Sequence, residues 1–353
     1  MSIVWELRLH SPLGARVATF DIWPELRAEV GVNRPAVYTL RLDGNDPRVA
    51  LFEQDGILEG WWTDAEQGIA WRREFCAWCI NPRRWTDANG GKHYQSSGLG
   101  LEDILARTII DAAAGSAASR KTGVGETVLK EWVNEHAGPG AGARARLGLG
   151  IEADAAAGGN WSGQRSNRNL LTVCQQVAEA TGLQFGVERT AAYTLEFRVW
   201  TPTDRRATVV FAEDRGNMGE PVVTETQSLV ANWIKAGGDG AGALRAVSYD
   251  SDAASIALSP QNRRERFVNA SDQATGNELD DRAAQELANN RAQVGLGFTV
   301  LQTPGCLYGK HYFLGDYVTA IYDGASYDRR IDSVQWAVTP TGAVARVRTV
   351  EVA

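Results

Sequence analysis

Apolar and polar side chains alternate along much of the first hundred residues. Between Ile3 and Leu9 every second residue is apolar, a period typical of a strand with one buried face. Gly, Pro, Asn and Asp separate further stretches of this kind, which predicts a β-rich region with tight turns. Further strands are expected at residues 15–22, 36–42, 49–54, 57–62, 68–80 and 93–99, with a hairpin turn at residues 63–68.

Helical spacing replaces this alternation from Leu101 onward. Apolar residues from Leu101 to Ala112 recur three and four positions apart and form one stripe, which predicts an amphipathic helix. A Gly- and Ala-rich stretch at residues 137–159 lacks any period and is expected to be an extended or mobile connection. Further helices are predicted at residues 126–136, 168–181 (ended by Gly182) and 277–292.

Strand patterns return in the second half of the chain. Asp323-Gly324 between two such patterns is a strong hairpin signal. Few strand–helix–strand units occur, so we expect a mainly β, α+β fold and not a doubly wound parallel sheet. The expected strands are residues 183–187, 193–200, 208–213, 222–235, 246–250, 254–258, 265–269, 297–302, 317–322, 329–338 and 343–352.

A glycine cluster lies between two of these strands, from Gly237 to Gly242, and Arg245 follows it. Glycine readily takes positive φ, so such a cluster permits a sharp turn. A phosphate-binding loop would need a helix after the glycines, whereas a strand pattern follows here. The cluster is therefore interpreted as a strand-to-strand turn.

Length and charge narrow the class of protein. A chain of 353 residues exceeds one ordinary core and predicts two to four domains. A net charge of −7 argues against a general nucleic-acid binder, although an acidic channel wall would let a polyanion pass without sticking. No stretch has the ~18 apolar residues of a membrane span. The first residues show a strand pattern without signal-peptide layout, which predicts folding in a cytoplasm.

The sequence offers little that indicates reactive chemistry. Cys76 and Cys79 form a lone Cys-x-x-Cys pair, whereas a zinc ribbon would need a second pair, so buried free thiols are favoured. No metal-binding or nucleophile-elbow motif occurs. We therefore assign no catalytic, cofactor-binding or metal-binding residue. The histidines (His10, His93, His136 and His311) are scattered and are expected to be structural.

Tryptophan is abundant, with twelve in the chain, and several crowd the predicted hairpin. Tryptophan suits cores and subunit interfaces, but it also stacks on sugar rings. A glycoside hydrolase would need two carboxyl groups about 5–9.5 Å apart in a cleft. Core or interface tryptophan is favoured, and a carbohydrate-binding or glycan-cleaving β protein remains the alternative. The residues concerned are Trp61, Trp62, Trp71 and Trp78, with Asp64, Glu66 and Glu74 nearby.

Several segments in order resemble one family, the baseplate hub or tail-tip hub proteins of long non-contractile-tailed phages. The most specific part is residues 262–272, joined to residues 278–282 and a helix, and followed by residues 313–319 and 330–334. The Gly/Ala-rich stretch carries no match. Earlier segments of the resemblance are residues 43–52, 56–60, 126–134, 166–171, 182–186 and 210–217.

The resemblance implies two tail-tube-like β-barrels with smaller α/β insertions, assembled as a ring-shaped homotrimer. It predicts a first barrel at residues 1–100 plus about 205–236, an insertion at 101–204 containing loop 137–159, and a second β domain at 237–353 containing helix 277–292. The ring would continue the tail tube and surround the channel for tape-measure protein and DNA. The family provides no catalytic residue to carry over.

We therefore expect a virion structural protein at the tail tip, folded in the host cytoplasm and without enzymatic activity. Its expected partners are further copies of itself, a distal tail protein, the tape-measure protein and tail fibre or spike proteins, with genomic DNA passing transiently. A second alternative is another tube-related protein, such as a distal tail protein, which would form a hexamer. The number of subunits separates the two.

Overall fold

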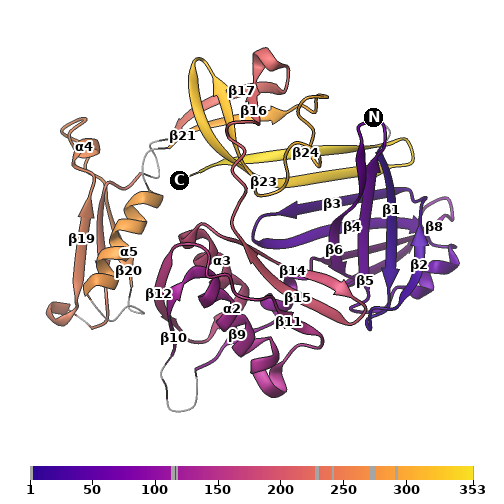
Figure 1. Ribbon diagram of the computed structural model, residues 1–353, viewed down its shortest axis with the longest axis horizontal. Helices are drawn as coiled ribbons and strands as arrows, with labels where there is room; N and C mark the ends of the chain where they lie inside the picture. Colours follow the sequence, from indigo (N-terminus) through magenta and orange to yellow (C-terminus); the bar gives the residue numbers. More distant parts are fainter. Residues whose placement is uncertain are drawn as a thin grey trace.

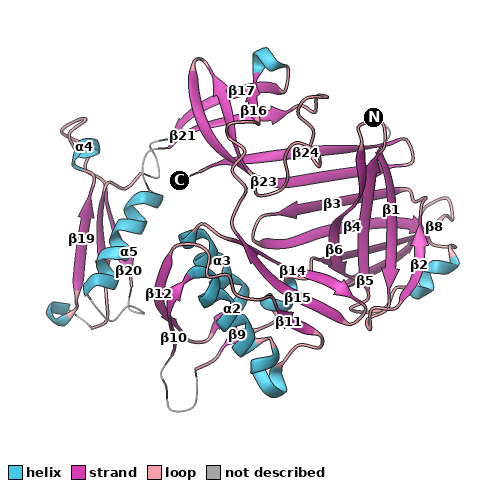
Figure 2. Cartoon of the chain, in the orientation of Figure 1, coloured by secondary structure: helices cyan, strands magenta, loops and turns pink. Residues whose placement is uncertain are grey.

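The computed structural model describes residues 3–112, 116, 118–226, 230–240, 242–270, 276–290 and 293–352. Strands form most of the regular structure, and the longer helices gather in two places, as Figure 2 shows. The expectation of a mainly β fold is confirmed at this level. None of the described helices is both long and apolar enough to cross a membrane.

A four-stranded antiparallel sheet contains the N-terminus, and we call it the first sheet. The predicted hairpin is present, because β5 pairs with β6 around a turn in which Asp64 accepts a hydrogen bond from the backbone of Gln67. The register shifts between Gly60 and Trp61, so the sheet carries a bulge. Its order is β2 (Arg16–Phe20), β1 (Ile3–His10), β5 (Ile57–Asp64) and β6 (Ile69–Trp78).

An eight-stranded sheet, the large sheet, joins the two ends of the chain, as Figure 1 shows. The C-terminal strand β23 pairs with β3 from the N-terminal region, with Val334 opposite Val30. Among the described residues the ladders do not close this sheet into a barrel. Its path is β16 (Val210–Ala212), β22 (Tyr317–Tyr322), β23 (Ala325–Thr339), β3 (Glu25–Gly31), β4 (Arg34–Asp43), β8 (Lys92–Leu99) and β7 (Asn81–Thr86), and β24 (Gly342–Glu351) pairs with β23.

The main core lies where the first and large sheets pack together. Alternate residues of each strand point inward, so Leu7 of β1 and Leu40 of β4 are both fully buried. Aromatic rings fill the centre, and Trp5 meets Trp336 edge-on with 5.0 Å between ring centroids. The same buried cluster extends to Val347 near the C-terminus, so one core draws on both ends of the chain.

A second core belongs to the insertion, by which we mean the described residues of 101–200. Helices α2 (Gly125–His136) and α3 (Leu170–Thr181) confirm two predicted helices. Asn169 caps α3 by accepting a hydrogen bond from Thr172, and Gly182 ends it with a φ of 70°. The other elements are α1 (Asp103–Ala106), β9 (Ile109–Ile110), β10 (Ser119–Val124), η2 (Pro139–Arg144), β11 (Leu149–Ile151), β12 (Asn160–Arg165), β13 (Arg168–Asn169), β14 (Gln184–Ala191) and β15 (Thr194–Trp200).

A third, smaller unit stands apart from the body at the left of Figure 1. Strands β17 (Met218–Thr226) and β21 (Gln293–Val300) form a two-stranded ribbon, and the lobe, meaning the described residues of 230–290, lies between them in sequence. In the lobe, α5 packs on one face of a sheet ordered β19, β18, β20. Its elements are β18 (Trp233–Gly237), η4 (Gly242–Leu244), β19 (Val247–Ser251), α4 (Ala253–Ile256), β20 (Glu265–Asn269) and α5 (Gly276–Asn289).

Four predicted elements are wrong. The strand predicted at residues 222–235 is divided between β17 and β18, and residues 230–232 belong to neither. The helix predicted from Leu101 reduces to the single turn α1, because the chain leaves at Arg107 and its next residues pair with β13. The strand predicted at residues 49–54 is instead led by the short helix η1 (Pro47–Leu51), capped by Asp46. The strand predicted at residues 254–258 begins with helix α4, capped by Asp252.

Other elements agree with the sequence pattern. Strands β20 and β22 have the predicted bounds, and β18 and β19 pair across the glycine cluster, which confirms a strand-to-strand turn. Within residues 137–159 the structure contains η2 and β11, so this connection is partly regular. The division at residues 100, 204 and 236 stays a prediction, and part of the C-terminal end of helix 277–292 lies outside the described residues.

Candidate functional site

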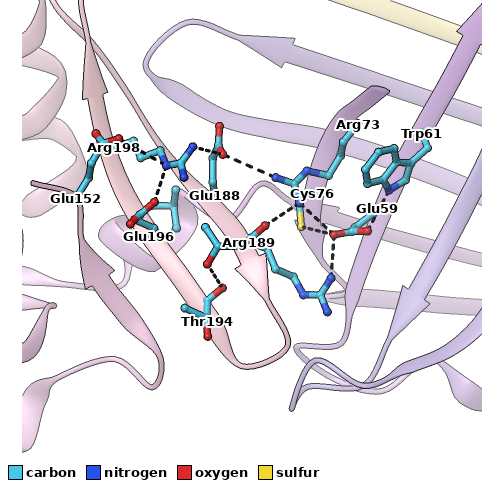
Figure 3. Close-up of polar contacts among 12 residues, drawn as sticks. Glu59, Trp61, Arg73, Cys76, Glu152, Glu188, Arg189, Thr194, Glu196 and Arg198 are labelled. Carbon is cyan, nitrogen blue, oxygen red and sulfur yellow. Dashed lines mark hydrogen bonds and ion pairs between the residues drawn. The ribbon is translucent and has the colours of Figure 1, made fainter. Parts of the chain in front are cut away.

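A buried carboxylate, Glu59, lies at the junction between the first sheet and the insertion (Figure 3). It stands on β5, where the strand alternation that turns Leu58 into the main core turns Ile57 and Glu59 to the opposite face, toward the insertion. Arg73 of β6 donates to Oε1 at 3.2 Å, and Arg189 of β14 donates to the same oxygen at 3.0 Å. Trp61 donates its indole N–H to Oε2 at 3.0 Å. The group therefore fastens a strand of the insertion to the first sheet.

Electrostatics stabilise Glu59 in its ionised form. Burial alone would raise its pKa, but the contact with His10, the hydrogen bonds from Trp61 and Arg189 and the charge of Arg73 together hold the pKa well below its usual range. His10 Nε2 lies 3.4 Å from Oε2. A permanently ionised carboxylate surrounded by donors accepts hydrogen bonds but cannot act as a proton donor near neutral pH. The group is suited to holding two units together.

A more exposed ion-pair network continues from this cluster along β14 and β15 (Figure 3). Arg198 contacts Glu188 at 2.9 Å and Glu196 at 2.6 Å, and Arg73 reaches Glu188 at 4.0 Å. Partly exposed pairs of this kind contribute little individually. Most of the stabilisation at the junction therefore comes from Glu59 and its buried partners.

A second buried carboxylate, Glu74 of β6, ties the first sheet to the C-terminal region. Its oxygens accept hydrogen bonds from Trp62 Nε1 at 2.7 Å, Tyr308 Oη at 2.7 Å and Trp336 Nε1 at 3.1 Å. Burial is the main cause that raises the pKa of Tyr308, and the nearby Glu74 charge adds to it, so Tyr308 remains a donor. The arrangement satisfies both indole N–H groups inside the main core.

A cavity of about 300 Å³ separates the large sheet from the insertion, and Glu102 lines it. Burial raises the pKa of Glu102 to about 7, although the backbone N–H of Val187 donates to it at 3.3 Å. Asn33 closes the rim from the β3–β4 turn, donating to Leu183 O at 3.1 Å and accepting from Phe185 N at 2.9 Å. The φ of Asn33 is 55°, a conformation that Asn tolerates better than most residues.

The predicted structural cysteines and histidines do not gather in one site, although His10 and Cys76 both contact Glu59. Cys79 packs in the main core and its thiol meets Tyr38 Oη at 3.2 Å, whereas Cys76 faces Glu59. Burial raises the pKa of the Cys79 thiol to about 11, and all four cysteines are free. Within the described ranges, no three His, Cys, Asp or Glu side chains are grouped to hold a metal ion.

The tryptophans and acids of the hairpin do not line a shared cleft. Trp62 and Glu74 bond each other inside the core, and Asp64 is buried while it holds the hairpin turn. Trp71 is exposed. Two of the three acids named for a glycan-cleaving site, Asp64 and Glu74, are therefore engaged in structural hydrogen bonds, whereas Glu66 is exposed.

The large sheet has a hollow on its surface and, in the part of the chain that the structure describes, a strand with an unpaired edge. Its outer side contains a hollow of about 600 Å³, crossed by a row in which Val37, Glu29, Gln335 and Arg346 lie opposite one another on β4, β3, β23 and β24. Among the described residues, β24 pairs only with β23, so ten residues without proline form an open edge. The far edge, β7, contains Pro82, which lacks an N–H.

Solved phage tail proteins share this fold. The 43 kDa tail protein of prophage MuSo2 from Shewanella oneidensis superposes with a TM-score of 0.62 at 12% identity, covering 98% of each chain. A tail protein from Neisseria meningitidis MC58 gives 0.60 at 14% identity, over 99% of this chain and 97% of that one. The prophage tail protein gp18 from Listeria monocytogenes EGD-e gives 0.55 at 13% identity, over 98% and 94%. The fold is thus that of phage tail proteins.

The sequence supports the same class more directly. The model of the Siphovirus ReqiPepy6 Gp37-like protein family matches residues 6–349. The chain therefore belongs to this family of siphovirus tail proteins, and the resemblance to a siphovirus tail family is confirmed. A search of curated proteins gave no match.

Proposed function

We propose that this chain is the hub at the tail tip, and that three copies close into a ring around the channel for tape-measure protein and DNA. The observation that carries the proposal is the open β24 edge of the large sheet. Among the described residues the outer edge of this ten-residue strand carries no ladder, although β21 packs near it. An unpaired edge invites pairing with other chains, and a closed ring of copies provides such pairing.

The interior chemistry supports a structural role. Two buried carboxylates, Glu59 and Glu74, accept hydrogen bonds that join distant strands. A rigid body of this kind suits a virion component that works through its contacts. The proposed partners are a distal tail protein, the tape-measure protein and tail fibre or spike proteins, and the net charge of −7 suits transient passage of DNA.

The number and symmetry of subunits test the proposal. The purified chain, at micromolar concentration, is expected to have three times its monomer mass of 38.3 kDa and to form threefold-symmetric rings by electron microscopy. A sixfold particle would assign the chain to the distal tail proteins. A strictly monomeric protein that turns over a glycan would favour the carbohydrate-active alternative.

A further inference from the structure

The lobe carries a sheet with one covered and one uncovered face. On the covered side, Ile234 and Ala236 of β18 pack against Leu279 and Leu287 of α5. Alternate residues point the other way, and there Tyr249 and Phe267 are 51% and 52% exposed. We call this second side the aromatic face, and it consists of Trp233, Lys235, Val247, Tyr249 and Phe267.

Each ring of the aromatic face has a cation beside it. Arg263 lies 4.8 Å from the Trp233 ring, and Arg245 lies 5.0 Å from the Phe267 ring. Lys235 stands in the middle strand, opposite Tyr249 on one side and Phe267 on the other, and its Nζ is 5.5 Å from the Tyr249 ring. Aromatic rings and Arg together are the composition of binding hot spots.

The charges of this face favour a protein over a nucleic-acid strand. Arg263 is paired with Glu265 at 2.7 Å, and Arg245 donates to the carbonyls of Gly238 and Gly237. Two of the three cations are therefore engaged within the lobe. Single-strand binding needs a continuous cationic groove along the phosphates, which one remaining ammonium at Lys235 does not provide. A partner with an apolar surface and a carboxylate for Lys235 fits better.

The body of the same chain offers such a surface. On the outward side of the ribbon, Val222 is exposed beside Gly297, and a Cβ added at Gly297 would meet only the Val222 carbonyl oxygen, at 3.8 Å. Glycine within a strand permits close approach of another chain. Glu220, two residues before Val222, is exposed and forms no ion pair among the described residues.

We propose that the aromatic face of the lobe docks on a second copy of this chain, with the ribbon as the complementary surface. The lobe joins the body in sequence only through the two strands of the ribbon, and it stands at one end of the long axis of the molecule (Figure 1). In the trimeric ring proposed above, on which this inference rests, a unit placed at one end of a subunit meets the neighbouring copy. Exposed Glu220 of the ribbon offers the carboxylate that Lys235 of the aromatic face requires.

Substitution of the exposed rings tests the docking in the full-length chain. The double variant Tyr249→Ser/Phe267→Ser is expected to weaken self-association about tenfold or more, measured by mass photometry over a dilution series. Its fold should persist, because the lobe core lies on the opposite face. Leu258→Ser, an exposed apolar residue of the lobe outside its strands, is the matched control and should leave the mass distribution unchanged.

A photo-crosslinking residue placed at Tyr249 identifies the partner. The expected product is a covalent pair of two copies, joined to residues of the ribbon. The docking inference would be overturned by crosslinks solely to another protein or to DNA, or by a double variant that associates like the wild type. If the wild type is still a trimer in that case, the hub proposal stands. A wild-type chain that is monomeric would instead overturn the hub proposal itself.

Discussion

Arg189 and Glu59 lie 130 residues apart in the chain, and 3.0 Å separates Nη1 of the arginine from Oε1 of the glutamate. The contact crosses from the insertion to the first sheet, where Glu59 is buried. A second bond from Arg189 reaches Gly14 O at 2.7 Å, so one guanidinium holds both a side chain and a loop of the first sheet. The relative position of the two units therefore depends on this arginine.

Removal of Arg189 is expected to destabilise the protein strongly. Arg189→Ala leaves a buried carboxylate with one partner fewer, and breaking such a pair costs roughly 3–5 kcal/mol of unfolding free energy. Denaturant unfolding measures the loss. Arg198→Ala removes a guanidinium from the more exposed network and should cost about 1 kcal/mol or less. Equal losses in the two variants would contradict the central role of the buried contact.

Substitution of Glu74 tests the connection between the first sheet and the C-terminal strands. Glu74→Leu leaves the donors of Trp62, Tyr308 and Trp336 without an acceptor, and each such group costs roughly 1–3 kcal/mol. Glu74→Gln retains one acceptor oxygen and should lose less. Urea unfolding followed by tryptophan fluorescence reports the effect, and Glu66→Leu in the exposed hairpin turn serves as the control. Similar stabilities of the Leu variants at both sites would refute the prediction.

Asn33 makes two hydrogen bonds to the insertion and also adopts a positive φ, and two variants separate these roles. Asn33→Ala loses both hydrogen bonds to β14 and places a Cβ at a φ of 55°, whereas Asn33→Gly loses the bonds but tolerates the angle. We expect both variants to be less stable than the wild type, and Ala to be worse than Gly by roughly 1 kcal/mol. Thermal unfolding gives the order. If Gly equals the wild type, the hydrogen bonds contribute nothing.

Glu102 is expected to make stability depend on pH. Its pKa is raised from 4.5 to about 7 in the folded protein, so between these values the folded chain binds more protons than the unfolded chain. The contribution of Glu102 to the free energy of unfolding is therefore fully present below about pH 4.5 and is lost as the pH rises through 7. The stability of Glu102→Gln relative to the wild type should therefore be higher at pH 8 than at pH 5. A constant difference in melting temperature between the two proteins would exclude this titration.

Elements were predicted correctly where turn and cap residues determine the conformation through contacts with their near neighbours in the chain. Asp323 and Gly324 have φ values of 50° and 74°, the positive angles that a tight hairpin needs, and both residues accept them readily. Asn169 and Gly182 likewise set the two ends of α3 within its own residues. Such features require no knowledge of distant contacts.

Three of the four wrong predictions of secondary structure have one of two causes: a helix cap nearby in the sequence or a contact with a distant segment. Asp46 and Asp252 cap short helices, a signal that the apolar pattern after each residue obscured. The helix expected from Leu101 ended early because Ile109 and Ile110 gain a partner strand 58 residues later, with Arg168 opposite Ile110. The Glu59–Arg189 contact could not be predicted, since only the packing of the insertion on the first sheet brings the two together.

The ribbon has a consequence for how this chain can change over evolution. Thr226 at the end of β17 lies directly opposite Gln293 at the start of β21, so everything between them enters and leaves the body at a single point. A tight turn joining these two positions could replace the intervening segment without altering any ladder of the body. The segment is therefore an exchangeable cassette, which recombination between related viruses can delete, lengthen or substitute while the scaffold beneath it keeps its shape.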